Sequence, residues 1–137
     1  MIRLFLLAQA VATTQAPGPA PAPPQIPPPV TEWSALPLFP LPRTAALGEA
    51  SAYVRAEVDA GRCRAAMMGQ QGAYLVAPVV ILVGPGGGVR RIVPRAIGCP
   101  TVEQYTVGFL LSLTRAGPGP SAPLTPGWYR LAVTYRW

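Results

Sequence analysis

The two cysteines, Cys63 and Cys99, are the residues of this chain with the most distinctive chemistry. They do not form the C-x-x-C pair of a redox site, and two thiols in a chain without histidine supply too few ligands for a zinc site. In an exported chain such a pair forms a structural disulfide. We therefore predict a Cys63–Cys99 bond, which would close a loop of about 35 residues and stabilise the fold by about 3–4 kcal/mol.

The glycine-rich run at positions 84–88 invites comparison with a phosphate-binding loop. A P-loop ends in Gly-Lys-Ser/Thr and leads into a helix, whereas this chain has no lysine and continues as Val89-Arg-Arg-Ile92, which is typical of a strand. The run is expected to form the turn of a β-hairpin.

The chain contains few residues suited to nucleophilic or acid–base catalysis. The chain has no histidine to act as a base, and no serine lies in a G-x-S-x-G motif. Glu49, Glu57 and Asp59 fall on a solvated helix face, and Glu103 lies in the first turn of a second helix, where it complements the helix dipole. We expect a protein that is not an enzyme and has no cofactor and no metal. A secreted domain of structural role or a small carboxylate-dependent enzyme is the alternative.

Residues 1–16 have the order of a secretory signal peptide, with Arg3, an apolar Leu4–Leu7 core and small residues around Ala10 and Ala12. Cleavage is expected after Ala10 or Ala12. The alternatives are an uncleaved membrane anchor and a start placed too far downstream that has cut a longer anchor short; the apolar run itself is far shorter than the ~20 residues that span a bilayer. Pro17–Pro29 then predicts a polyproline II spacer of about 40 Å. The protein is expected to be periplasmic or secreted.

The formal net charge is +6, and every basic side chain is an arginine. Such a charge favours acidic partners, either acidic patches of proteins or an anionic membrane surface. Nucleic acid is not expected, because the chain is predicted to be exported and shows no aromatic–basic RNA-binding signature.

The elements that must position these residues follow from hydrophobic spacing. Helices are predicted over 45–60 and from Thr101 onward, and strands over 73–83, 89–93 and 128–137. This order predicts an α+β domain over residues 44–137, in which a small antiparallel sheet (hairpin plus C-terminal strand) carries two helices packed on one face. Residues 17–43 are assigned to the proline-rich spacer and an irregular lead-in whose apolar side chains cover an edge of the core.

Local signals define the ends of the helices. Thr44 is the predicted N-cap of the first helix, and Gly61 is its predicted stop. Thr101 and Gln104 match a capping box, in which each side chain bonds the backbone N–H of the other. Gly108 lies inside the second helix, where close packing on the sheet would explain it. Pro78 predicts an edge or a bulge near the start of its strand.

The last strand shows the clearest alternation. Tyr129, Leu131, Val133, Tyr135 and Trp137 form the inner face, and Arg130, Thr134 and Arg136 form the outer face.

From Val80 to Trp137, the order of elements resembles the C-terminal domain of TonB-family energy transducers. The matching segments are Val80–Val83, Gly88–Val93, the helix from Thr101, and Leu131–Trp137. The chain departs from the family pattern at 96–98, where Ala-Ile-Gly stands in place of Ser-Ser-Gly. The resemblance implies a non-enzymatic cell-envelope module. Such a module would bind a protein, of which an outer-membrane protein is one example, by pairing the edge of the terminal strand that bears Arg130, Thr134 and Arg136.

Overall fold

A long strand, β2 (Gly72–Val83), runs through the middle of the sheet and organises the molecule. The computed structural model describes residues 12–18, 21–41, 47–116 and 123–137. Its other elements are η1 (Val30–Ala35, a 3-10 helix), α1 (Leu47–Asp59), β1 (Met67–Gly69), β3 (Val89–Pro94), α2 (Pro100–Ala116) and β4 (Gly127–Arg136). The predicted α+β class, with a small antiparallel sheet and two helices, is confirmed; the sheet has four strands.

The two edges of β2 are occupied differently. β4 pairs with β2 from Tyr74 to Val83, while β1 and β3 share the opposite edge. Pro78 lies within the central strand, on the side that faces β3, and its carbonyl accepts the Arg95 N–H at 2.9 Å. Since proline has no N–H to donate, the ladder between β2 and β3 ends there. The strand begins at Gly72, so Pro78 lies in its middle, and the expected position near the start was wrong; the register irregularity with β3 falls between Leu82 and Val83.

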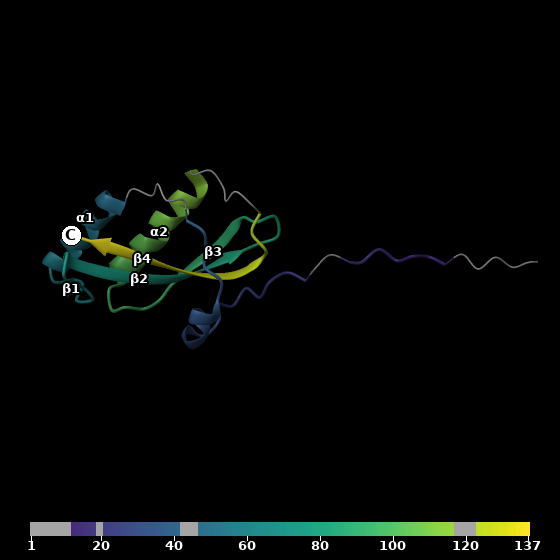
Figure 1. Cartoon of the computed structure of the whole chain (residues 1–137), viewed down its shortest axis with the longest axis horizontal. Helices are drawn as coiled ribbons and strands as arrows, with labels where there is room; N and C mark the ends of the chain where they lie inside the picture. The colour runs from purple at the N-terminus through teal and green to yellow at the C-terminus, as the bar shows by residue number, and fades with distance from the viewer. Residues whose placement is uncertain (1–11, 19–20, 42–46, 117–122) are drawn as a thin grey trace, which may run out of the picture.

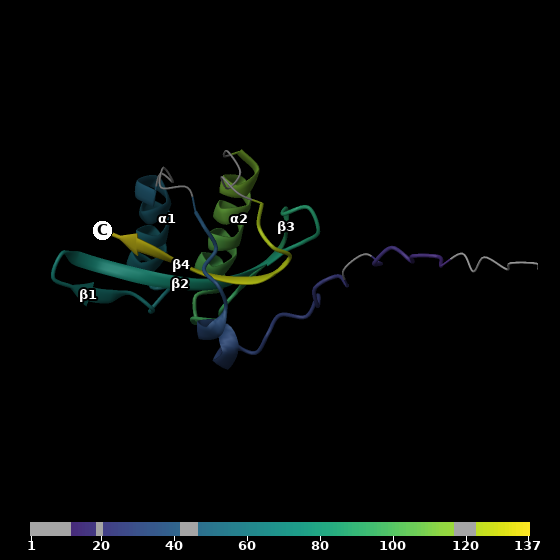
Figure 2. The same cartoon turned by 45° about the vertical axis from the view of Figure 1, so that its right-hand side comes forward.

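Both helices pack on one face of the sheet (Figures 1 and 2). Alternate residues of β2 and β4 point toward them because successive strand side chains project to opposite faces. The buried members of this core from the two strands and two helices include Leu75, Ala77, Val79, Ile81, Val83, Tyr129, Val133, Tyr135, Ala50, Val54, Val102 and Leu110. The inner face predicted for the terminal strand is thus the face that the helices cover.

One buried hydrogen bond ties β4 to α2. The hydroxyl groups of Tyr135 and Thr106 lie 2.8 Å apart, and Thr106 also donates to the carbonyl of Val102. Both residues are fully buried. Burial raises the pKa of Tyr135 to about 12, so its hydroxyl stays protonated at neutral pH. The bond satisfies two polar groups that would otherwise be costly inside the core.

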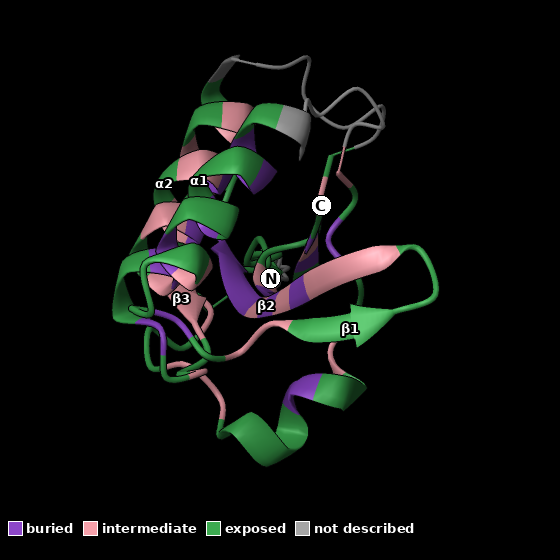
Figure 3. Ribbon diagram, turned by 90° about the vertical axis from the view of Figure 1, so that its left-hand side faces the viewer, coloured by how far each residue is buried: buried purple, intermediate pink, exposed green. Residues whose placement is uncertain are grey.

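The opposite face of the sheet is partly covered by the lead-in. Figure 3 shows η1 on the side away from the helices, largely exposed with one buried stretch. Trp33 of η1 packs with Val80, Leu82 and Trp128 in a second apolar cluster. Farther along, Phe39 is buried in the main core, with its ring edge-on to Tyr129 at 6.1 Å.

The structure alters several predicted boundaries. The first helix, predicted over 45–60, is described from Leu47 to Asp59, and Thr44 lies outside the described residues. Gly61 follows it with a φ of 75°, as a helix stop requires. β1 was not predicted; its Met67 and Met68 are 47% and 81% exposed, so the segment has no buried face to produce alternation.

Gly108 corrects one expectation. It is exposed on α2, and a Cβ placed there would meet no atom within 4 Å beyond its own helix backbone, so close packing does not explain the glycine.

Gly108→Ala should raise the free energy of unfolding by about 0.5–1 kcal/mol, because alanine loses less backbone entropy in a helix. Urea denaturation followed by circular dichroism measures the change. Gly61→Ala is the matched control: its positive φ disfavours a side chain, and that variant should lose stability. A Gly108→Ala protein no more stable than the parent would contradict the prediction.

Candidate functional site

The outer edge of β4 is the strand edge where the predicted site residues meet. In an antiparallel pair, alternate residues direct their backbone N–H and C=O groups toward and away from the neighbouring strand. Trp137 exchanges both backbone bonds with Ala73 across the sheet, so the odd-numbered residues of β4 face β2. The even-numbered residues direct their backbone groups outward. Arg130, Thr134 and Arg136 therefore share this edge, and their side chains share the face opposite the helices.

The Arg130 end of this edge is occupied by the chain itself. The N–H of Arg130 donates to Pro37, and its carbonyl accepts the N–H of Phe39, both at 2.9 Å. These bonds form a parallel bridge at Leu38. The guanidinium Nε of Arg130 also donates to the carbonyl of Leu36 at 2.9 Å. Arg130 thus anchors the lead-in instead of presenting a free backbone edge.

The Arg136 end is closed by α1. The N–H of Arg136 donates to the Oγ of Ser51 at 3.2 Å, and its guanidinium carbon lies 5.7 Å from the centre of the Tyr74 ring. Between the two ends, the outward backbone groups of Ala132 and Thr134 form no hydrogen bond with the described part of the chain. Ala132 is exposed and Thr134 is half-buried. The sequence analysis did not identify Ala132 as a site residue, although its place between Arg130 and Thr134 in the alternation puts its backbone on the same outer edge.

The predicted disulfide is present and joins the two helices. Cys63 follows α1 and Cys99 precedes α2; both are buried, and their Cα atoms lie 4.9 Å apart. The bond closes a loop with a sequence separation of 36. It fixes the end of α1 beside the start of α2, so the two helices cover the sheet as a unit.

A buried carboxylate reinforces the same junction. Glu57 is only 6% exposed, and its oxygens accept bonds from both Nε and a terminal nitrogen of Arg62, at 2.9 and 2.8 Å, and from the hydroxyl of Thr101 at 2.8 Å. Hydrogen bonds from Arg62 and then Thr101 lower the pKa of Glu57 from 4.5 to about 2. Glu57 was expected on a solvated face; its neighbours from the following loop and from α2 enclose it.

The contact with Glu57 also corrects the predicted capping box. α2 begins at Pro100, so Thr101 lies inside the helix and is not its N-cap; its hydroxyl donates to Glu57, and no hydrogen bond joins Thr101 to Gln104 in the described part of the chain. The carboxylate of Glu103 accepts the backbone N–H groups of Ile97 and Cys99 at 3.2 and 3.0 Å. Glu103 thus satisfies backbone donors just ahead of the helix, whereas the predicted capping box had assigned the N–H of Thr101 to Gln104.

The described carboxylates are either bonded to neighbouring groups or exposed to solvent. Glu57 and Glu103 are engaged as above, Asp59 pairs with Arg55 at 3.5 Å on the surface, and Glu49 is exposed. Within the described ranges, no three His, Cys, Asp or Glu side chains are grouped as a metal site would need. One cavity of about 380 Å³ lies between residues 22–25 and the β2–β3 turn, and its lining contains Arg90 but no carboxylate.

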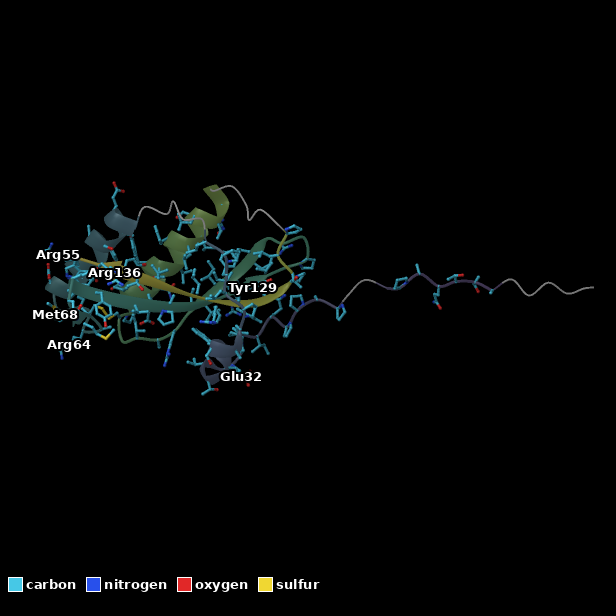
Figure 4. The ribbon with its side chains drawn as sticks, viewed as in Figure 1. Glu32, Arg55, Arg64, Met68, Tyr129 and Arg136 are labelled. Atoms are coloured by element: carbon cyan, nitrogen blue, oxygen red, sulfur yellow. A yellow bond between two sulfur atoms is a disulfide. The ribbon has the colours of Figure 1, made fainter. Side chains whose placement is uncertain are left out.

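A second exposed surface lies at the end of the domain that carries the β1–β2 hairpin. Met68, Arg64 and Arg136 all lie at this end (Figure 4). Met68 is 81% exposed, and both arginines are exposed. The surface combines apolar and basic groups, the chemistry that the expected anionic membrane partner would require.

Comparison of the chain with profiles of protein families, with curated proteins and with solved structures gave no match. In the part of the chain that the structure describes, no helix has the length and apolar character needed to cross a bilayer. The functional interpretation therefore depends on the geometry above and on the resemblance carried by Val80–Trp137.

The low pKa of Glu57 predicts a specific loss of stability in acid. A carboxylate with a pKa of about 2 when folded and 4.5 when unfolded stabilises the fold fully above 4.5, and this stabilisation is lost as the pH falls toward 2. Glu57→Gln should melt at a lower temperature than the parent at pH 7, and the two melting temperatures should converge near pH 2. Thermal melts across this range test the prediction, with the exposed Glu49→Gln as control. A constant difference at every pH would contradict it.

Proposed function

We propose that this chain is an exported, non-enzymatic protein-interaction module that binds an extended segment of a partner at the outer edge of β4. The observation that carries the proposal is the pair of outward backbone positions, Ala132 and Thr134, between the Leu38 bridge and Ser51. An incoming strand would pair with the N–H and C=O groups there, as in β-augmentation.

The side chains beside this edge favour an acidic partner. Arg136 is exposed next to Thr134, and the chain carries a net charge of +6. Complementary charge speeds the encounter and sets the register of the partner, while the backbone bonds supply affinity. The closed ends at Arg130 and Arg136 restrict the paired stretch to a few residues, which suits a short segment bound reversibly.

Two further features support an envelope role. The Cys63–Cys99 bond belongs to an oxidising compartment, and residues 1–16 have the composition of a signal peptide. The order β2–β3–α2–β4 is the order that the resemblance to TonB C-terminal domains depends on. That resemblance favours an outer-membrane protein as the partner.

Export is tested on the mature protein. Expressed with its own N-terminus in a bacterium with a periplasm, the chain should be recovered from that compartment beginning at Val11 or Thr13, with both cysteines resistant to alkylation until a reductant is added. Mass spectrometry reads both properties in one experiment. The same chain without residues 1–16, kept in the cytoplasm, should have two reactive thiols. Intact Met1 together with free thiols in the full chain would refute export.

Edge binding is tested with a photo-crosslinking amino acid at position 134 in cells of the native host. Ala132→Pro removes an outward N–H without removing a bond to β2, so the adduct at position 134 should fall about three- to tenfold, the effect of one lost hydrogen bond. Ala132→Ser keeps the N–H and should keep the adduct, and a crosslinker at the exposed Ser112 of α2 should give none. If Ala132→Pro folds normally and leaves the adduct unchanged, binding at this edge is excluded, and a structural role is favoured.

A further inference from the structure

The proline-rich segment before η1 is held against the sheet by specific hydrogen bonds. The segment approaches from outside the domain and passes beneath the sheet into η1 (Figures 1 and 2). Its carbonyl groups accept three side-chain bonds: Trp128 Nε1 to Pro24 at 2.8 Å, Arg91 to Gln25 at 3.2 Å, and Trp33 Nε1 to Pro28 at 2.9 Å. Residues 24–29 are therefore bound to the domain, and are not a free spacer.

The bound segment has the chemistry of a polyproline II ligand. Five of the seven residues from Pro23 to Pro29 are prolines, and Pro29 has φ −59° and ψ 146°, which are polyproline II values. This conformation makes no internal hydrogen bonds, so its carbonyls are free to accept bonds from a receptor. Aromatic side chains that line a groove are the usual means of recognising such segments.

The receptor side of the contact comes from distant parts of the chain. Trp128 at the start of β4 and Arg91 on β3 donate to successive carbonyls, those of Pro24 and Gln25. The ring of Trp128 is 9% exposed and packs in the second apolar cluster, so its N–H is aimed by a fixed ring. An indole ring has apolar faces, which suit proline rings, and an N–H donor at its edge, which suits an unpaired carbonyl.

Burial of apolar side chains does not explain the position of the segment. Ile26 is the largest apolar side chain between Pro23 and Pro29, yet it is 81% exposed. A segment positioned by hydrophobic burial alone would bury this side chain first. The backbone carbonyls are bound instead, by the side chains of Trp128, Arg91 and Trp33.

We propose that Trp128 and Arg91 form a binding site for polyproline II segments, and that the chain's own Pro23–Pro29 is its occupant. The site lies on the sheet face opposite the helices and is separate from the strand-pairing positions Ala132 and Thr134. Its occupancy determines how far the N-terminal segment extends from the domain. Docking of residues 24–29 removes about 20 Å from the roughly 40 Å that a free Pro17–Pro29 segment would span.

The proposal is tested by competition in trans on the full chain. A tethered ligand has an effective concentration near millimolar, so a free peptide cannot displace it readily. A fluorescent peptide of residues 17–29 should bind about tenfold or more tightly to a chain carrying Pro23→Gly, Pro24→Gly and Pro27→Gly than to the parent chain, as measured by anisotropy. Adding Trp128→Phe, which keeps an aromatic ring but removes the N–H donor, should abolish the gain. Trp137→Phe is the matched control and should preserve it.

Two results would overturn the proposal: equal peptide affinity for the parent and the triple-glycine chain, or binding to the latter that survives Trp128→Phe. A second measurement does not depend on the glycine variant. In small-angle X-ray scattering, Trp128→Phe combined with Arg91→Ala should lengthen the full chain by up to about 12 Å, because only the residues ahead of the Trp33–Pro28 bond are released. A folded double variant with the same maximum dimension as the parent would show that these donors do not hold the segment.

Discussion

The apolar character of β2 on both faces is the constraint on which the rest of the structure depends. From Val79 to Val83 every side chain of this strand is buried, so both faces need cover. A single layer of helices can protect only one face of a sheet. The other face obtains its cover from Trp33 and Trp128, which pack on Val80 and Leu82. The proline-rich lead-in is consequently part of the folded unit, because removing it would expose the half of β2 that lies beneath it.

The helical cover depends in turn on the junction between α1 and α2. The disulfide fixes the spacing of the two helices, and Glu57 joins the end of α1 to the loop and to α2 through Arg62 and Thr101. All three polar groups at this junction satisfy one another, so burying the carboxylate does not leave an unpaired charge. The carboxylate is thus used for structure. Its environment lowers its pKa, whereas a general acid at neutral pH would need the opposite shift.

The sequence predicted the features whose signal is local. The alternation of β4 identified its two faces, and the cysteine pair identified the disulfide. Prediction from the sequence failed where a residue's bonding partner lies far away in the chain. The pattern at Thr101 and Gln104 satisfies the rule for a capping box, yet α2 begins at Pro100, so Thr101 lies inside the helix, where its hydroxyl donates to Glu57, 44 residues away. Trp128 and Pro24 are 104 residues apart, and no periodicity in either segment signals their bond. Met67–Gly69 has no buried face, so it left no pattern to detect.

The candidate edge of β4 and the bound proline-rich segment are connected by one continuous stretch of chain. The chain passes from Pro24, which is bonded to Trp128, through η1 to Pro37 and Phe39. Both of these residues form backbone hydrogen bonds with Arg130. The same stretch therefore shortens the reach of the N-terminal segment and closes one end of the β4 edge. A partner at Ala132 would pair directly beside the Leu38 bridge, so the lead-in sets where the incoming strand must stop. Since strand side chains alternate between faces, a fixed stop also fixes which face each partner side chain meets. In the proposed complex, the lead-in would thereby add specificity that the backbone groups of the edge do not supply.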